Sequence, residues 1–190
     1  YARTGGSADT ASHAFNITGS LLNAGTRNAD LGDLINEGIY TLSVSGTDIA
    51  GNVGSTVSND SITYDTQKPN FGSVTPIANA DVNEQGAQVT FTLSEKLQDA
   101  LISYKATTSY NGETANNEYT YALTTTEKNN FVGVSQTKSI PGLKDGNTYN
   151  LALTGTDLAG NTADTVANTG VLYDVTPPNA IIAVPITGRN

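Results

Sequence analysis

Apolar and polar residues alternate along several short runs of the chain. In QVTFTLS (88–94), Val89, Phe91 and Leu93 fall on one face, and hydroxyl or amide side chains fall on the other. The run YNLALT (149–154) alternates in the same way, and this period of two is typical of half-buried β-strands. No stretch shows a sustained period of 3.6 residues, which a helix would require. The pattern therefore predicts short strands and no helix.

Three further runs between residues 69 and 177 are rich in β-branched and aromatic residues: Leu101–Tyr104, Tyr119–Leu123 and Val166–Tyr173. Residue pairs typical of tight turns separate the runs, namely Asn-Gly (111–112), Pro-Gly (141–142) and Asp-Gly-Asn (145–147). Six to eight short strands without a helix in about 100 residues are typical of an immunoglobulin-like or fibronectin-III-like β-sandwich. The sequence therefore predicts an all-β fold.

The chain contains an internal repeat. Each residue of the first copy corresponds to a residue a fixed number of positions later, so that position 46 corresponds to position 155. The segment GTDIAGN (46–52) recurs as GTDLAGN (155–161), and YDTQKPN (64–70) recurs as YDVTPPN (173–179). Without gaps, 18 of the 44 positions from 34 to 77 are identical to their counterparts from 143 to 186. Self-similarity at a fixed period is the signature of a repeat architecture, so we expect tandem copies of one domain.

The repeat predicts the domain boundaries. A complete copy spans residues 69–177, residues 1–68 are the later part of a preceding copy, and residues 178–190 form the first strand of a following copy. Two full periods would be longer than the chain by 28 positions. By counting alone, the positions missing from the first copy are those that correspond to residues 82–109 of the complete copy. We expect the chain to be a piece of a longer protein, with an incomplete first copy.

Composition narrows the possible functions. The chain carries 18 acidic and 9 basic side chains, a formal charge of −9, so nucleic acid and anionic membranes would repel it. It has no cysteine and a single histidine, His13, which excludes thiolate and multi-histidine metal sites and disfavours a Ser–His–Asp triad. No apolar run is long enough to span a bilayer. We expect no enzymatic activity and no membrane insertion in this segment.

The segment PGLKDGNTYNLALTGTDLAGN (141–161) resembles the end of a fibronectin-III or bacterial Ig-like domain. The signature Y-x-L-x-x-x-G-T-D-x-A-G-N followed by Y-D-x-x-x-P resembles the tandem bacterial Ig-like repeats of giant extracellular adhesins. This resemblance implies tandem immunoglobulin-like Greek-key β-sandwiches in an extracellular cell-surface protein. It also implies that Tyr40 and Tyr149 are tyrosine-corner residues, whose hydroxyl groups bond a nearby backbone group.

Acidic residues at predicted strand ends are the candidate metal ligands. In such a sandwich the loops 94–99 and 156–161 lie at the pole that the linker 64–70 enters, so Asp65, Glu95 and Asp157 are expected to meet there. Calcium takes about 6–8 oxygen ligands from carboxylates, amides, carbonyls and water. By the resemblance, similar adhesin repeats bind Ca²⁺ at domain junctions, where the ion stiffens the array. We expect an affinity in the weak extracellular range, roughly 10⁻⁴–10⁻³ M.

The same reasoning adds the amide oxygen of Asn161, the equivalent residues Asp48 and Asn52 at the entry pole of the first copy, and Asp174 at the start of the exit junction. The full set of candidate ligands is Asp65, Glu95, Asp157, Asn161, Asp48, Asn52 and Asp174. The motif Asp-x-Ala-Gly-Asn has a second interpretation, because Asp and Asn cap their own backbone amides and Gly accepts positive φ in a tight turn. On that interpretation the aspartates only form turns.

Three functional hypotheses follow. The first is a structural extender of a long surface adhesin or fibre, whose partners are neighbouring repeats and whose cell-surface or carbohydrate ligand binds elsewhere in the parent protein. The second is a subunit of a surface filament completed by donor-strand exchange, with AIIAVPI (180–186) as donor. The third is a carbohydrate- or host-protein-binding module that uses a face lined by Tyr104, Tyr110, Tyr119 and Tyr121.

Overall fold

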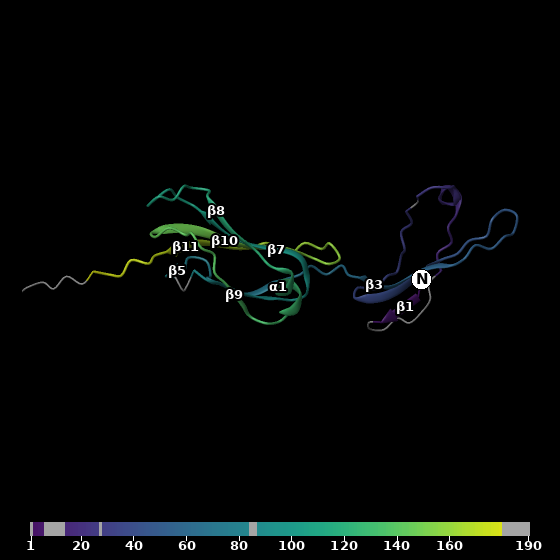
Figure 1. The fold of residues 1–190 in the computed structure, drawn as a ribbon, viewed down its shortest axis with the longest axis horizontal. Helices are drawn as coiled ribbons and strands as arrows, with labels where there is room; N and C mark the ends of the chain where they lie inside the picture. The colour runs from purple at the N-terminus through teal and green to yellow at the C-terminus, as the bar shows by residue number, and fades with distance from the viewer. Residues whose placement is uncertain (1, 6–13, 27, 84–86, 180–190) are drawn as a thin grey trace, which may run out of the picture. The chain divides into compact units, whose positions relative to one another are not determined.

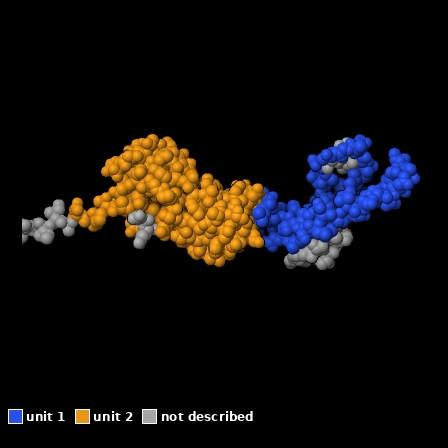
Figure 2. All heavy atoms as spheres, in the orientation of Figure 1, with its two compact units in different colours: residues 1–68, 158–161 blue, residues 69–157, 162–190 orange. Residues whose placement is uncertain are grey.

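The computed structural model describes residues 2–5, 14–26, 28–83 and 87–179 (Figure 1). The chain divides into two compact units (Figure 2). Unit 1 comprises residues 1–68 and 158–161, and unit 2 comprises residues 69–157 and 162–190. Of the strand predicted at 178–190, residues 180–190 lie outside the described residues.

Unit 2 is built from two β-sheets. One has five strands in the order β5-β11-β10-β7-β8, and the other has three in the order β4-β6-β9. All neighbouring strands are antiparallel except β5, which runs parallel to β11. The bounds are β4 Phe71–Thr75, β5 Asp81–Val82, β6 Val89–Leu93, β7 Leu97–Ala106, β8 Glu118–Ala122, β9 Gln136–Lys138, β10 Asn147–Asp157 and β11 Val166–Tyr173. The predicted all-β character is confirmed.

The alternating runs place their apolar faces in one core that both sheets share. Val89 and Phe91 of β6 are fully buried, and so are Tyr149, Leu151 and Leu153 of β10. All belong to a single cluster of buried residues. Burying a large apolar side chain stabilises a fold by about 1.5–3 kcal/mol. The inward faces that the alternation predicted are therefore confirmed for both strands.

The prediction that no helix would form is wrong for one short segment, α1 (Thr125–Asn130). Thr124 is its N-cap: the Thr124 hydroxyl accepts a hydrogen bond from the Glu127 amide, and the Glu127 carboxylate accepts one from the Thr124 amide. This capping box satisfies two backbone donors at the helix start. A six-residue helix is too short to show a helical period, so the T-x-x-E spacing at 124–127 was its only signal.

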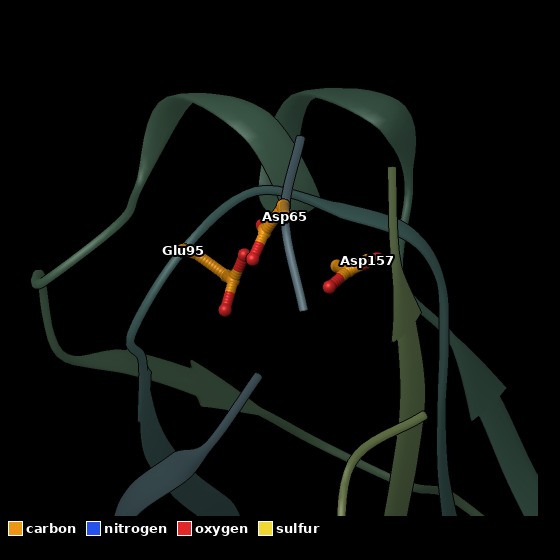
Figure 3. Close-up of side chains that lie close together, drawn as sticks. All are labelled: Asp65, Glu95 and Asp157. Atoms are coloured by element: carbon orange, nitrogen blue, oxygen red, sulfur yellow. The ribbon is translucent and has the colours of Figure 1, made fainter. Parts of the chain in front are cut away.

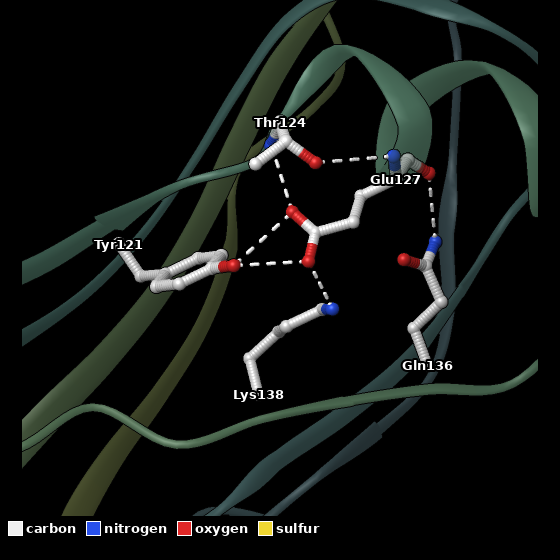
Figure 4. A network of polar contacts seen from close by, with 5 residues as sticks. All are labelled: Tyr121, Thr124, Glu127, Gln136 and Lys138. Carbon is white, nitrogen blue, oxygen red and sulfur yellow. Dashed lines mark hydrogen bonds and ion pairs between the residues drawn. The ribbon is translucent and has the colours of Figure 1, made fainter.

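Glu127 also connects α1 to a strand of each sheet (Figure 4). Its carboxylate accepts the hydroxyl of Tyr121 in β8, at 2.9 Å, and pairs with the ammonium of Lys138 in β9. Gln136 of β9 donates its side-chain amide to the Glu127 carbonyl at 3.1 Å. The helix is thus fixed where the two sheets meet at this end of the core.

Unit 1 contains one three-stranded sheet in the order β1-β2-β3, with β1 at Ala2–Gly5, β2 at Gly38–Val44 and β3 at Val57–Tyr64. A short 3₁₀ turn, η1, covers Gly19–Leu22. Every pairing of β2 with β3 has a counterpart, at the offset of the sequence repeat, in the pairing of β10 with β11, and the register shift falls at the same position. The sequence repeat is therefore also a repeat of backbone register.

The pairing of β1 shows which part of the repeat residues 1–68 contain. Arg3 pairs with Tyr40 as Ala106 pairs with Tyr149, and Ala2 pairs with Thr41 as Lys105 pairs with Asn150. Strand β1 therefore occupies the place of the last residues of β7. The counterpart that residues 1–68 lack is 69–103, not 82–109 as counting suggested, because the segment between β1 and β2 is shorter than its counterpart in unit 2.

The tyrosine corners expected from the resemblance are present in both units. The Tyr40 hydroxyl accepts a hydrogen bond from the Ile35 amide at 2.8 Å. The Tyr149 hydroxyl accepts one from the Lys144 amide at the same distance. In each unit the bond joins the penultimate strand to the turn that precedes it.

Candidate metal centre

Three carboxylates from separate segments converge on one point (Figure 3). Asp65 lies in the linker that joins β3 to β4, Glu95 lies in the turn between β6 and β7, and Asp157 is the last residue of β10. One oxygen from each residue lies within 4.8 Å of the other two. The three acids that the sequence was expected to bring together are therefore close in space.

The backbone around each acid is held by hydrogen bonds. Asp157 is 1% exposed and pairs with Leu97, next to a shift in the β10–β7 register. Beside Glu95, Ser94 donates its amide to the Asn70 carbonyl at 3.0 Å, and its hydroxyl accepts the Asn70 amide at 2.8 Å. The β6–β7 turn is thus attached to the end of the linker, which keeps Glu95 in place.

The linker around Asp65 is held by two side chains that the candidate list missed or assigned differently. The Asn36 side-chain oxygen accepts both the Thr66 amide, at 2.6 Å, and the Thr66 hydroxyl, at 3.0 Å. Asn161 donates its side-chain NH₂ to the Asp65 carbonyl at 3.0 Å. Asn161 therefore positions the linker backbone through its nitrogen, whereas the prediction gave it a role as an oxygen ligand.

The exit linker repeats this arrangement in unit 2. Asp145, the counterpart of Asn36, accepts the Val175 amide at 2.7 Å and the Thr176 hydroxyl at 2.6 Å. Hydrogen bonds, first that from Thr176 and then that from Val175, lower the pKa of Asp145. Asp174 accepts the Thr176 amide at 2.9 Å, as Asp65 accepts the Gln67 amide. We call Asn36 and Asp145 the linker clamps.

The sequence carried a signal for the clamps, but a weak one. Both residues stand two positions before the first residue of the penultimate strand. Asp145 lies in the segment 145–147, which we interpreted only as turn chemistry. Nothing in the sequence shows that the side chain reaches a linker some 30 positions later. That contact depends on the paired hairpin, which returns the chain to the turn.

The remaining predicted ligands do not gather into a comparable group. Asp48 accepts the Asn52 backbone amide and side-chain NH₂, each at 2.8 Å, and these bonds lower the Asp48 pKa, the side-chain bond most. That is the turn-forming interpretation of the motif. Asp174 is exposed. Among the described residues, the only cluster of three or more acidic, histidine or cysteine side chains is Asp65, Glu95 and Asp157.

The geometry of the three acids suits a calcium ion. Like charges about 4 Å apart repel by about 1 kcal/mol in water and about 4 kcal/mol at an effective dielectric constant of about 20. A divalent cation removes that repulsion. Calcium binds oxygen at about 2.3–2.6 Å, so two ligands on opposite sides of the ion are about 4.6–5.2 Å apart. Oxygens within 4.8 Å of one another fit that span.

A fourth carboxylate, Glu113, is buried at another place and needs no ion. It is 5% exposed and accepts the hydroxyls of Tyr149 at 2.7 Å and Tyr119 at 2.8 Å. It also accepts the Asn117 side-chain NH₂ at 3.0 Å and the Thr114 amide at 2.9 Å. Burial raises the Glu113 pKa, but these bonds, led by that from Tyr149, outweigh it and lower the pKa to about 2.

The tyrosine-lined sugar face is not found. Tyr104 is fully buried in the core, with its hydroxyl on the Ala87 carbonyl. The hydroxyls of the half-buried Tyr119 and Tyr121 bond Glu113 and Glu127. Only Tyr110 is well exposed, at 62%. The four rings that the third hypothesis required therefore form no common exposed platform.

Comparison with known proteins gives no relative. No family model, no curated protein and no solved structure matches the chain. Among the described residues, no helix has the length and apolar character needed to cross a membrane. Function must therefore be argued from the site and from the repeat.

Proposed function

We propose that the chain is a structural extender segment of a long extracellular surface adhesin or fibre, and that Ca²⁺ binds Asp65, Glu95 and Asp157. The observation that carries the proposal is the convergence of these three carboxylates, one of them almost fully buried, from segments far apart in sequence. Carboxylates this close repel one another, and a divalent cation bound between them would relieve that repulsion.

The repeat supports the structural part of the proposal. We interpret unit 2 as an immunoglobulin-like Greek-key sandwich, because a five-stranded sheet and a three-stranded sheet share one core and a tyrosine corner opens the penultimate strand. Two hairpins with one register and two clamped linkers indicate copies of one design. Repeats that bury their own cores and are joined by short linkers suit a mechanical role.

Each acid would have a distinct part in such a site. Asp65 brings the linker, Glu95 brings the β6–β7 turn, and Asp157 brings the end of the central strand β10. Backbone carbonyls and water would complete the coordination of the ion. A bound ion would restrict the linker, since releasing Asp65 would then require breaking a metal bond as well as the Asn36 bonds.

The experiment is a calcium titration of the chain by calorimetry, with two aspartates compared. We expect a dissociation constant of roughly 10⁻⁴–10⁻³ M for the unaltered protein. Asp157→Asn, which keeps the shape but removes the charge, should weaken binding at least tenfold. The matched control is Asp48→Asn, its counterpart in the repeat, because Asp48 belongs to no group of three such side chains among the described residues and instead bonds Asn52. Equal losses in both variants would contradict the assignment.

The mechanical role has a separate test. Small-angle scattering of a protein with several copies of residues 69–177 should show a smaller maximum dimension after chelation, because freed linkers allow bent arrangements. Circular dichroism should change little, since the core of unit 2 does not include the three acids. An unchanged maximum dimension would exclude the stiffening role, and calcium binding would still stand.

A surface filament subunit is the second candidate. It is favoured by the exposed apolar side chains on β2 and β3 of unit 1, which include Val44 and Val57. The proposed donor, residues 180–186, lies outside the described residues.

A further inference from the structure

We propose that the β2–β3 sheet of unit 1 is a docking surface for a polypeptide segment with the apolar pattern of residues 69–103. That segment would act in two ways. It would add a strand along the edge of β2, and it would cover the apolar face of the sheet. The proposal is independent of calcium.

Matched positions in the two units show that the face is a core surface without its cover. Val44 is 48% exposed, whereas its counterpart Leu153 is fully buried. Ile62 is 39% exposed, whereas Val171 is 1% exposed. The backbone pairing is the same in both units, so the difference lies in what covers the sheet. Exposed apolar surface of this kind marks an interaction site.

Two equivalent glycines show the missing cover directly. A Cβ atom built on Gly155 would meet the Asp99 carbonyl at 2.9 Å, the Phe71 ring at 3.1 Å and Leu97 at 3.2 Å. A Cβ built on Gly46, its counterpart, would meet nothing within 4 Å. The residues that enclose Gly155 all belong to 69–103.

The edge of β2 is also only partly paired. In unit 2, β7 pairs with β10 from Tyr149 to Asp157. In unit 1, β1 pairs with β2 from Ile39 only as far as Thr41. Among the described residues, no strand continues along Leu42–Val44 on that side. Unpaired strand edges bind an added strand through main-chain hydrogen bonds.

The repeat identifies the occupant. Because Arg3 takes the place of Ala106, the strand missing from the β2 edge is the rest of β7, and its chain direction is already set by β1. The apolar face of the sheet would be covered by the equivalents of β6 and β4, because Val89, Phe91 and Phe71 of these strands belong to the core in unit 2. The tail 180–184 corresponds to β4, which pairs only with β6 in unit 2. A tail strand alone would therefore leave the β2 edge open.

The test is a full-length chain with the sequence of residues 69–103 fused directly before Tyr1, studied in calcium-free buffer. Tyr1 then stands where Tyr104 stands in unit 2, so the register is preserved. Amide hydrogen exchange at Leu42–Val44 and Ile62 should slow by at least 100-fold. The control carries the same extension with the residues copied from Val89, Phe91 and Leu93 changed to Ser, and it should give no slowing.

Four outcomes would overturn the proposal. The first is unchanged exchange in the extended chain. The second is protection of Leu42–Val44 in the original chain that rises with concentration, which would make a second copy the occupant. The third is protection in the original chain that disappears when residues 180–190 are deleted, which would make the tail the donor. Equal slowing by the Ser-substituted control would also contradict the proposed apolar contact.

Discussion

The carboxylates of Glu113 and Glu127 each connect several elements of unit 2. Glu113 joins the loop after β7 to tyrosines of β8 and β10, and Glu127 joins α1 to β8 and β9. Hydrogen bonds to an ionised group are worth about 1.5–3 kcal/mol each. Both carboxylates must therefore stay ionised for these contacts to keep their full strength.

This requirement predicts loss of stability in acid. Burial raises the pKa of both groups, but hydrogen bonds outweigh it, and both pKa values fall to about 2 from an ordinary 4.5. A lowered pKa in the folded state stabilises the fold above pH 4.5, and this stability is lost as the pH falls toward 2. The urea midpoint of unit 2 should therefore decrease across that window.

The variant Glu113→Gln/Glu127→Gln separates these two groups from the other acids. It should start less stable at about pH 6 and lose less on acidification, because a neutral amide does not titrate. Parallel pH profiles for the variant and the original protein would contradict the role of the two carboxylates.

The linker clamp gives a prediction about positioning. Asn36→Ala removes two hydrogen bonds to Thr66, each worth about 0.5–1.5 kcal/mol. Calcium affinity should fall several-fold if Asp65 is a ligand, and hydrogen exchange at the Thr66 amide should speed up with or without calcium. Asn36→Asp should restore both, because Asp145 accepts the corresponding backbone amide, that of Val175, at the exit linker, together with the hydroxyl of the next residue, Thr176. Faster exchange with unchanged affinity would remove Asp65 from the site.

At the scale of an element, the strand β10 is closely covered at Gly155. Gly155→Ala should destabilise unit 2 by about 1–3 kcal/mol, because the added methyl meets backbone at Asp99 and side chains of Phe71 and Leu97. Gly46→Ala should change stability by less than about 0.5 kcal/mol, since the space there is open. Chemical denaturation of both variants measures the difference, and equal effects would mean that unit 1 is covered as unit 2 is.

Strands with a clear period of two were predictable, and the others were less so. β6 and β10 each bury one face, so their sequences alternate. In β7 the consecutive residues Ile102, Ser103 and Tyr104 are all buried, and this removes the alternation that would have shown its full length. α1 was missed because its six residues are held by the cap and by Glu127, not by an apolar face.

At the scale of the whole molecule, the two units differ in how much core they have. Unit 2 has a cluster of 18 buried hydrophobic residues, whereas Tyr40 is the only buried hydrophobic residue described in unit 1. We therefore expect two classes of hydrogen exchange. Amides of β7 and β10 should exchange only through cooperative unfolding, and those of β2 and β3 through frequent local opening. Equal protection in both units would contradict this difference.

The convergence of the three acids was predictable because strand order determines which loops share an end of a sandwich. Asp65, Glu95 and Asp157 were therefore expected to meet from their positions in the sequence alone. The clamps and the Glu113 contacts were not predictable, because they depend on side-chain reach across the folded hairpin and the loop after β7. The sequence pattern predicts which loops lie next to one another, but it does not predict which polar atoms of those loops form hydrogen bonds.

The shared register of the two hairpins bears on how such a gene can change length. If recombination joins the codon of Leu42 to that of Ala152, the product lacks the stretch 43–151, yet β2 and β11 form one hybrid hairpin. Each residue of the hybrid hairpin pairs with the residue equivalent to its original partner, and the register shift is retained. Duplication at the same point also preserves the pairing and the register shift. Copies can thus be gained or lost by unequal crossing-over at this point without changing the register of the hairpin.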